Sequence, residues 1–402
     1  MKNDKKPQVR FKGFNDDWEQ RKFEDVVQIE RGGSPRPIDD YITDSPNGLN
    51  WVKIGDAPAQ GHYITKTAEK IRPEGLSKTR EVHPGDLILS NSMSFGKPYI
   101  IGIDGCIHDG WLFIRDTNNT FDLTFLCHLL GTPQMLDQYR SLAAGSTVNN
   151  LNKELVGNTV VTIPKIDEQR VLGQYLERLD NLITLHQRKC DKLQKIKKSM
   201  LEKMFPQNGM KKPEIRFKGF NDDWEQRKFG DVGSVAMCKR IFKEQTSDEG
   251  EISFYKIGTF GGEPDAFISR ELFDEYKNKY PYPNKGDILI SASGSIGRTI
   301  EFTGKDEYFQ DSNIVWLKHK NEIDNRFLKV LYAVVEWSCE GSTIKRLYND
   351  NFLKKEFMLP QINEQIKLGK YFKQLDHLIT LHQRKLEKLK YIKKSMLENM
   401  FV

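Results

Sequence analysis

Several features that would assign a function directly are absent from this sequence. The five cysteines are scattered singly and form no C-x-x-C pair, so neither a disulfide framework nor a zinc site is predicted. No apolar run reaches the length of about 18 residues that spans a bilayer. Residues 1–7 have no apolar stretch of the kind that secretory signals carry. We therefore expect a cytoplasmic protein that does not contact a membrane.

Enzyme signatures are also absent. The chain contains no G-x-x-x-x-G-K-[ST] phosphate-binding loop, no H-E-x-x-H or G-x-S-x-G motif, and no glycine cluster with the N-P-P-Y-type tetrapeptide of amino-methyltransferases. Pro264-Asp265 followed by Glu275-Tyr276-Lys277 fits a nuclease pattern whose carboxylates would hold a metal ion. The stretch after it is not strand-like, so we interpret the match as a coincidence. The sequence predicts a recognition protein without catalytic or metal-binding residues.

What the sequence does contain is a tandem duplication. The segment RFKGFNDDWEQRKF at residues 10–23 recurs unchanged at 216–229, and LITLHQRK at residues 182–189 recurs at 378–385. Identities of this length in the same order exclude chance. We expect the near-identical segments to meet the same partner twice, and the divergent segments between them to meet two different targets.

Each copy ends in a segment that is typical of a long helix. From Asp167 to Met204 the only glycine is Gly173, and no proline interrupts the good helix formers. Apolar residues recur in alternate steps of three and four in both copies, which is the period of a coiled coil. We expect helices of about 35–40 residues, roughly 55 Å long at 1.5 Å per residue. They are predicted to pair as an antiparallel coiled coil within the chain, although pairing between two chains satisfies the same pattern.

Two polar features mark these helices. His186 and His382 hold equivalent seam positions, and we interpret them as a pair that fixes the register of the helices rather than as a metal bridge. The chain has a net charge of +6, of which residues 163–207 carry +4 and residues 359–402 carry +5. The basic helix ends are interpreted as solvated faces, with contact to a partner or to phosphate as the alternative. The divergent regions are not basic in sum, so bulk charge does not identify their target.

The divergent regions share a skeleton of short apolar strands separated by turns. The predicted strands are residues 50–55, 86–90, 110–115, 287–291 and 313–318, and the predicted helices are residues 123–142 and 326–336. The fold class is therefore α+β, with two tandem mixed α/β domains, two long helices and the pseudo-twofold symmetry of a duplication. The boundaries are placed at residues 1–162, 163–207, 208–358 and 359–402.

Polar loops after the predicted strands carry the candidate binding residues. Their hydroxyls, amides and basic groups suit phosphate contact and hydrogen bonding to base edges, although ordinary Gly/Ser turns have the same composition. The candidates in the first region are Arg31, Ser34, Arg36, Lys53, Asn91, Ser92, Ser94, Lys97, Ser146, Thr147, Asn149 and Asn150. Those in the second region are Lys239, Arg240, Lys243, Lys256, Ser293, Ser295, Arg298, Ser342, Thr343, Lys345 and Arg346.

Taken together, these patterns resemble the specificity subunit of type I restriction-modification systems. Each half opens with W-x-x-x-x-F-x-D-V, at residues 18–26 and 224–232, and continues with a G-D-[LI]-[LI] strand. Each half then carries I/L-P-x-I-x-E-Q, at residues 163–169 and 359–365, directly before its long helix. The resemblance covers essentially the whole chain.

The resemblance implies a non-catalytic, sequence-specific DNA-binding subunit. Each globular domain would read one half of a bipartite, asymmetric site in double-stranded DNA. The helices would set the spacing and dock two methyltransferase subunits, through which restriction/translocase subunits join. The chain itself would hold no cofactor, and S-adenosylmethionine, ATP and Mg²⁺ would belong to the partner subunits. We expect readout in the major groove, where all four base pairs differ, with half-sites about one DNA turn, roughly 34 Å, apart.

Two other classes of function remain alternatives at this point. A self-contained nuclease or methyltransferase is opposed by the absent motifs, and activity of the purified chain alone would favour it. A coiled-coil scaffold without DNA contact would be favoured if no sequence-selective DNA binding occurred even with a methyltransferase partner. The target sequence itself cannot be deduced from the residues.

Overall fold

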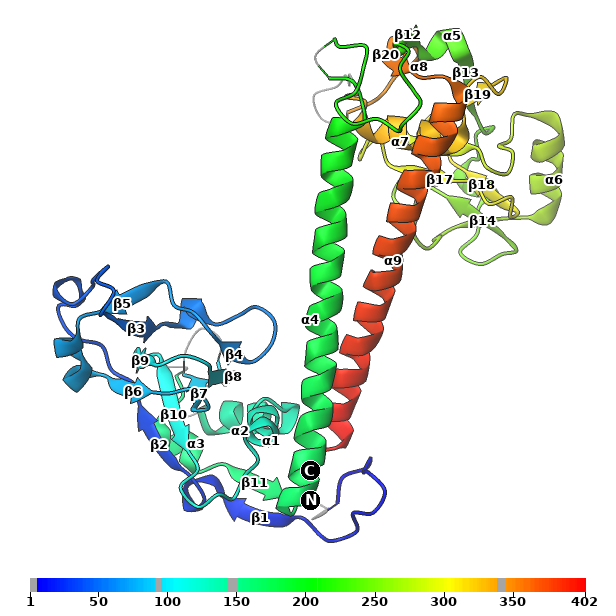
Figure 1. Ribbon diagram of the computed structural model, residues 1–402. Coiled ribbons are helices and arrows are strands. Elements are labelled where there is room, and N and C mark those ends of the chain that lie inside the picture. The colour runs from blue at the N-terminus through cyan, green and yellow to red at the C-terminus, as the bar shows by residue number, and fades with distance from the viewer. Residues whose placement is uncertain (1–5, 92–94, 144–149, 208, 338–344) are drawn as a thin grey trace. The chain divides into compact units, whose positions relative to one another are not determined.

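The computed structural model describes residues 6–91, 95–143, 150–207, 209–337 and 345–402. The chain divides into two compact units, of which the first comprises residues 1–189 and 382–402 and the second comprises residues 190–381. Each unit therefore combines one globular domain with a part of each long helix (Figure 1). The two units are described separately below.

The first globular domain is built from short strands and helices. Its strands are β1 (Glu19–Lys22), β2 (Gln28–Arg31), β3 (Leu49–Val52), β4 (Tyr63–Ile64), β5 (Glu69–Ile71), β6 (Arg80–Val82), β7 (Leu87–Ser90), β8 (Pro98–Ile101), β9 (Gly105–Ile107), β10 (Trp111–Arg115) and β11 (Val160–Ile163). Its helices are α1 (Leu123–Leu130), α2 (Pro133–Ala143) and α3 (Lys153–Gly157), with 3₁₀ turns at Phe23–Asp25, Ile38–Asp40, Ile54–Asp56 and Pro73–Lys78. The strands form sheets of order β2-β10-β7-β8-β4, β5-β3-β9-β6 and β1-β11.

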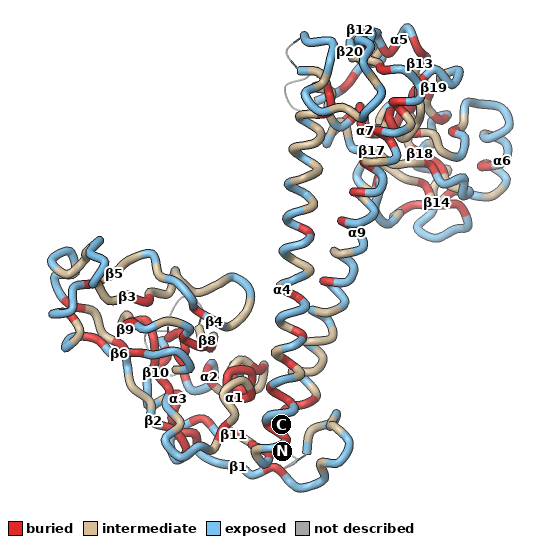
Figure 2. The backbone as a smooth tube through the Cα atoms, viewed as in Figure 1, coloured by how far each residue is buried: buried red, intermediate tan, exposed pale blue. Residues whose placement is uncertain are grey.

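The central sheet of this domain is buried on both faces. All four residues of β7 are buried, as Figure 2 shows in red. Because successive strand residues point to opposite faces, Leu87 and Leu89 join the core beneath α1 and the long helices, whereas Ile88 packs on the other side with Trp111 and Phe113. A continuous apolar run therefore folds as a strand between two cores.

The second globular domain repeats this plan with fewer strands. Its strands are β12 (Glu225–Lys228), β13 (Gly233–Met237), β14 (Ile252–Tyr255), β15 (Phe267–Ile268), β16 (Ile288–Ser291), β17 (Thr299–Glu301), β18 (Glu307–Phe309), β19 (Ile314–His319) and β20 (Glu356–Leu359). Its helices are α5 (Phe229–Val232), α6 (Arg270–Lys279), α7 (Asn325–Val334) and α8 (Asn349–Lys354), with a 3₁₀ turn at Lys243–Gln245. The sheets have the orders β13-β19-β16-β17, β15-β14-β18 and β12-β20.

The predicted strands are confirmed as β3, β7, β10, β16 and β19, and the helix predicted at 326–336 is confirmed as α7. The single helix predicted at 123–142 is wrong, because α1 ends at Leu130 and α2 begins at Pro133. Gly131 closes α1, and Pro133 occupies the first position of α2, where its missing N–H costs no helical hydrogen bond. The two helices together cover the same stretch of sequence.

The two long helices are α4 (Ile166–Lys203) and α9 (Ile362–Asn399), each of 38 residues, or about 57 Å at 1.5 Å per residue. In the first unit, the start of α4 packs against the end of α9, with Leu176 and Met400 buried in one core. In the second unit, the end of α4 packs against the start of α9, with Met204 and Phe372 buried together. The helices therefore pair antiparallel within the chain.

Each long helix is followed by a phenylalanine that packs in the core of a globular domain. Phe401 stacks on Phe125 at 5.5 Å between ring centroids and meets Trp18 edge-on at 6.3 Å. Phe205 stacks on Phe327 at 5.8 Å and meets Trp224 edge-on at 5.7 Å. The core of the first domain is thus completed by the last residues of the chain.

The I/L-P-x-I-x-E-Q motif joins each globular domain to its long helix. Gln169 donates to the carbonyls of Pro164 and Thr120, at 2.9 and 3.0 Å, and accepts from the amide of Asp122, the N-cap of α1, at 2.9 Å. Gln365 accepts from the amide of Asp324, the N-cap of α7, at 2.9 Å. A single glutamine side chain therefore aligns two helix starts.

Candidate DNA interface

Four of the candidate residues of the first domain meet around Asp109, which lies two residues before β10. Ser34 donates its hydroxyl to the Asp109 carboxylate at 3.0 Å, and Arg36 lies 3.9 Å from the same carboxylate. Arg31 and Asn91 both donate to the Asp109 carbonyl, at 3.2 and 2.9 Å. Three loops that are distant in the sequence are therefore fixed at one end of the central sheet.

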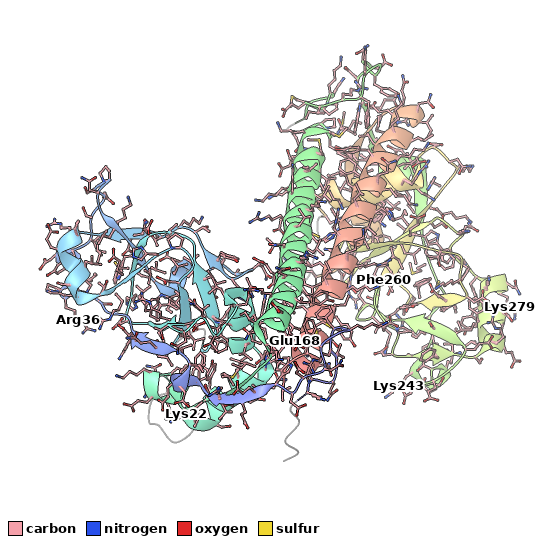
Figure 3. All side chains as sticks on the ribbon, turned by 60° about the horizontal axis from the view of Figure 1, so that its bottom comes forward. Lys22, Arg36, Glu168, Lys243, Phe260 and Lys279 are labelled. Atoms are coloured by element: carbon pink, nitrogen blue, oxygen red, sulfur yellow. The ribbon has the colours of Figure 1, made fainter. Side chains whose placement is uncertain are left out.

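The side chains of this cluster differ in exposure. Asn91 is buried, and its amide is used to hold the loop. The Arg36 side chain is 84% exposed and lies at the outer edge of the domain (Figure 3). Arg36 is therefore the member that is freest to reach a phosphate or a base edge.

The second domain has the same arrangement of loop backbone at this end of its sheet, which we call the frame, but it carries different side chains. Arg240, in the loop after β13, pairs with Asp311 at 2.8 Å. Asp311 lies three residues before β19, one position further from its strand than Asp109 is from β10. The buried Ser293 donates to the side chain of Asn313 at 2.7 Å. Arg346 reaches the same place through an isolated β-bridge to Ser293.

Matching backbone hydrogen bonds confirm that the two frames are equivalent. In the first domain, the Asn91 amide donates to the Gly110 carbonyl at 3.0 Å, and the Leu151 amide donates to the Asn91 carbonyl at 2.9 Å. In the second domain, the Ala292 amide donates to the Asn313 carbonyl at 2.7 Å, and the Leu347 amide donates to the Ala292 carbonyl at 2.8 Å. The loop sequences differ between the two domains, whereas the backbone hydrogen bonds that hold the loops are the same.

The remaining described candidates do not join these clusters through any contact that the structure shows. Lys53 pairs with Glu69, and Lys256 pairs with Asp265 at 2.9 Å. Lys97 lies over the Tyr99 ring, 5.0 Å from its centroid, and Lys239 lies over the Tyr280 ring at the same distance. Exposed side chains are found at Asn150, Lys243, Ser295, Arg298 and Lys345. Seven candidates lie outside the described residues: Ser92, Ser94, Ser146, Thr147, Asn149, Ser342 and Thr343.

A groove of about 730 Å³ lies at the same end of the second sheet and contains residues that the sequence analysis missed. Met237 and Ala292 line it together with Arg346 and the segment from Leu347 to Asn351. Tyr348 is 50% exposed there. The sequence signal was the Tyr-Asn-Asp-Asn run of residues 348–351, since amides beside an aromatic ring suit contacts with bases.

The nuclease-like pattern does not form a metal site in the described structure. Asp265 pairs with Lys256, and Glu275 pairs with Lys279 at 3.0 Å on α6. Lys277 pairs with Asp306 at 3.1 Å. The pattern therefore breaks up into separate surface ion pairs.

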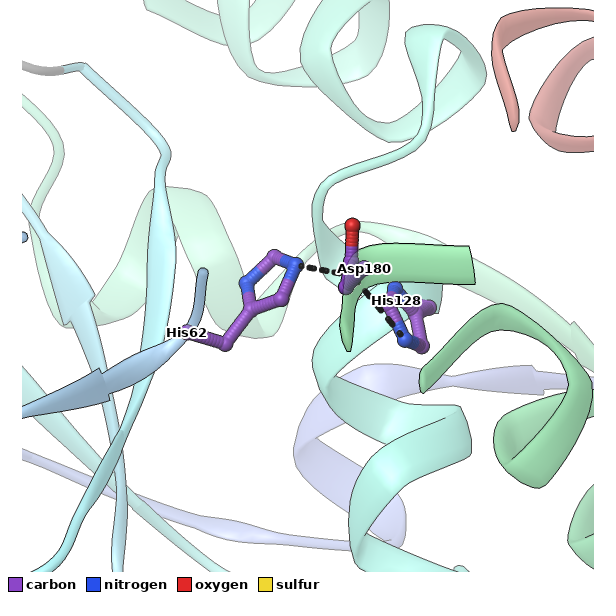
Figure 4. A group of neighbouring side chains, drawn as sticks. All are labelled: His62, His128 and Asp180. Carbon is purple, nitrogen blue, oxygen red and sulfur yellow. Dashed lines mark ion pairs between the residues drawn. The ribbon is translucent and has the colours of Figure 1, made fainter. Parts of the chain in front are cut away.

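A different polar cluster lies where the first domain packs on α4 (Figure 4). Nε2 of His62 and Nε2 of His128 lie 3.1 and 3.7 Å from Oδ2 of Asp180, and Lys393 donates to Oδ1 of Asp180 at 2.5 Å. Burial acts to lower the pKa of His62, but the contacts with the Asp180 carboxylate and with Cys127 together outweigh it and raise the pKa to about 9. Burial, followed by the positive charges of His62 and Lys393, lowers the pKa of His128 to about 3.

The fold and these clusters define a class of protein: a duplicated recognition protein that presents two different sets of polar loops on one repeated frame. The model of the type I restriction modification DNA specificity domain matches the chain twice, at residues 15–195 and 221–391. The chain belongs to this family and is a DNA specificity subunit with two target-recognition domains, which is a non-catalytic component. No helix among the described residues is long and apolar enough to cross a membrane.

Similar proteins carry related descriptions. A putative type I restriction enzyme specificity subunit of Haemophilus influenzae is 57% identical over 141 residues, which is 35% of this chain and 37% of that protein. The putative MjaX specificity subunit of Methanocaldococcus jannaschii is 24% identical over 95% of this chain and 92% of its own length. The MjaVIII specificity subunit of the same organism is 23% identical over 95% and 91%.

Solved structures share the fold. The S subunit of a type I restriction-modification system from M. genitalium superposes with a TM-score of 0.65 at 14% identity, over 99% of both chains. A chain from a study of complex assembly in a type I restriction-modification system gives a TM-score of 0.52 at 16% identity, over 96% of this chain and 97% of that chain.

Proposed function

We propose that each globular domain reads one half of a bipartite, asymmetric site in double-stranded DNA, and that the long helices set the spacing between the half-sites. The observation that carries this proposal is the contrast between the two sheet ends. One frame presents Arg31, Ser34 and Arg36 beside Asp109, and the other presents Arg240 beside Asp311. Equivalent frames with different donors suit two different base sequences in the major groove.

We also propose that the helices dock two methyltransferase subunits, through which restriction subunits join the complex. Support comes from apolar side chains that the helix pairing leaves exposed. Leu182 and Leu185 are 43% and 46% exposed in the first unit, and their duplicates Leu378 and Leu381 are 41% and 38% exposed in the second. Leucines three positions apart lie on one helix face, so a partner helix would bury them. In this arrangement S-adenosylmethionine, ATP and Mg²⁺ belong to the partners.

The test is to map modified adenines in DNA from cells that express this chain with its methyltransferase partner. Replacing residues 213–358 by the domain of another family member should change one half-site and leave the other unchanged. Unchanged methylation after the replacement, in cells where the motif depends on this chain, would contradict the proposal. Loss of both half-sites would instead indicate a misfolded chimera, which circular dichroism of the purified chain identifies.

A second variant tests the spacing. Inserting one heptad, seven residues, into α4 within 189–198 and another at the duplicate positions 385–394 of α9 keeps both seams in register. The modified half-sites should then be separated by more base pairs, with their sequences unchanged. A control with the heptad in α4 alone breaks the pairing and should abolish methylation.

A further inference from the structure

Three side chains in the first unit face one another in an arrangement typical of a metal site. His62 comes from the segment before β4, His128 from α1 and Asp180 from α4, so three elements converge (Figure 4). One ligand atom from each lies within 4.8 Å of the other two. The two imidazole rings meet edge-on with their centroids 4.9 Å apart.

The separations fit a tetrahedral ion. Donor atoms that stand about 2.0–2.1 Å from zinc at tetrahedral angles are roughly 3.3 Å apart. Nε2 of His62 and Nε2 of His128 lie 3.1 and 3.7 Å from Oδ2 of Asp180. That oxygen is buried and lies within ion-pair distance of both rings, but it accepts no hydrogen bond of good geometry. A buried carboxylate oxygen without a donor is costly unless something else satisfies it.

We propose that His62, His128 and Asp180 bind one divalent transition-metal ion, of which Zn²⁺ fits best. Two imidazole nitrogens and one carboxylate oxygen form a donor set that zinc accepts, whereas Mg²⁺ and Ca²⁺ favour oxygen alone. The buried Cys127 thiol contacts the His62 ring and lines the same cavity, so it is available for the fourth position. That cavity holds about 40 Å³, which suffices for one ion.

Lys393 lies beside the proposed site, and its positive charge opposes the binding of an ion. Lys393 donates to Oδ1 of Asp180, the oxygen that the ion leaves free, but its Nζ also lies 3.4 Å from Nε2 of His62. The second unit has the same pair, because Lys197 donates to Asp376 at 2.5 Å. No histidine lines the cavity beside Asp376 among the described residues. The lysine–aspartate pair therefore belongs to the shared architecture, and the two histidines are an addition in the first unit.

The residues around the proposed site give an ion access from solvent and determine what its binding would do. His62 and Asp180 also line an adjoining groove of about 380 Å³, which gives an ion a path from solvent. A bound ion would tie the segment before β4 and helix α1 to α4. It would thus fix the first recognition domain on its helix without touching the loops around Asp109.

The experiment uses the purified full chain, freed of metal by a chelator and titrated with Zn²⁺ and with Co²⁺. We expect one ion per chain by elemental analysis, a raised melting temperature, and a visible Co²⁺ spectrum of tetrahedral intensity. A sulfur-to-cobalt charge-transfer band would identify Cys127 as the fourth ligand, and Cys127→Ser would remove that band. His62→Gln and Asp180→Asn should each weaken binding by about 100-fold or more.

Matched controls come from the duplication. Asp376→Asn removes the equivalent carboxylate, whose cavity no described histidine lines. His186→Gln removes a histidine from a pair that forms no three-ligand group among the described residues. Both variants should therefore bind metal like the wild type. Lys393→Met should strengthen binding, because it removes the competing positive charge. The proposal is overturned if the wild-type chain binds no metal at micromolar free Zn²⁺. It is equally overturned if folded His62→Gln protein, checked by circular dichroism, binds as tightly as the wild type.

Discussion

Arg10 and Glu168 form a two-pronged ion pair in which Nε and Nη2 of the arginine each lie 2.7 Å from a carboxylate oxygen. The Glu168 side chain is only 3% exposed. Arg216 and Glu364 repeat the pair in the second unit, at 2.7 and 2.8 Å. Each arginine opens the repeated RFKGF segment, and each glutamate belongs to the I/L-P-x-I-x-E-Q motif. Two motifs far apart in the sequence are therefore the two halves of one contact.

Removing one partner of this pair should be strongly destabilising. Arg10→Ala leaves a buried carboxylate without its counter-charge, and we expect a loss of about 3 kcal/mol in the free energy of unfolding, measured by urea denaturation. The double variant Arg10→Met with Glu168→Met leaves no charge unpaired and should lose less than the single variant. Equal losses in the two variants would mean that packing, and not the ion pair, stabilises this junction.

The close approach of α4 to α1 depends on Gly173. A Cβ atom at this position would lie 2.3 Å from Oγ1 of Thr124 and 2.7 Å from Oδ1 of Asp122, which is the N-cap of α1. We expect Gly173→Ala to lower the free energy of unfolding by about 1–3 kcal/mol through forced displacement of α1. Gly55→Ala is the matched control, because its Cβ would meet no atom within 4 Å. A stable Gly173→Ala protein would show that the helices can separate at little cost.

The packing of Phe401 after α9 gives a prediction about stability. Phe401 is 4% exposed and packs on Trp18 and Phe125. Phe401→Ala should lower the free energy of unfolding by about 3–5 kcal/mol, as for other buried phenylalanines. It should also red-shift the fluorescence of Trp18, because the cavity left by the ring would let water reach this buried side chain. Phe401→Leu keeps most of the apolar volume and should lose less. An unchanged midpoint in Phe401→Ala would mean that the end of α9 is not part of this core.

These contacts show which parts of the fold the sequence could predict. Periodicity gave the long helices and the buried strands, because both follow from spacing along the chain. The sequence could not show that Phe401 enters the core with Trp18, since that contact joins residues at opposite ends of the chain. The break between α1 and α2 was within reach, because Gly131 and Pro133 are both helix-ending residues.

The candidate interface was predictable only in part. Residue type selected Arg31, Ser34 and Arg36, which the structure brings together. It could not select Asp109, because an aspartate that holds three loops looks like any turn residue in the sequence. Residue type also did not select His62 and His128, which are 66 residues apart in the sequence and become neighbours only through folding.

The exposed arginines of the two frames should contribute to DNA binding. Arg36→Ala and Arg240→Ala should each weaken binding of the assembled complex to its own site by about 5–100-fold, measured by fluorescence anisotropy. The matched controls are Arg140→Ala and Arg270→Ala, which remove surface arginines that pair with Asp137 and with Glu251 and Asp306. Equal losses in variants and controls would mean that only general charge matters.

The histidine pair in the seam should make the first unit sensitive to acid. Nδ1 of His186 lies 2.8 Å from Nδ1 of His382, so one ring must donate and the other must accept, which requires a neutral acceptor. Burial, followed by the positive charges of neighbouring groups including His382, lowers the pKa of His186. Because the unfolded chain then binds the proton more readily than the folded chain, stability is lost as the pH falls below about 6.5. Histidine-selective NMR should find a His186 pKa below that value, and His186→Leu should flatten the fall in melting temperature between pH 7 and pH 5, whereas an unshifted pKa would contradict the pairing.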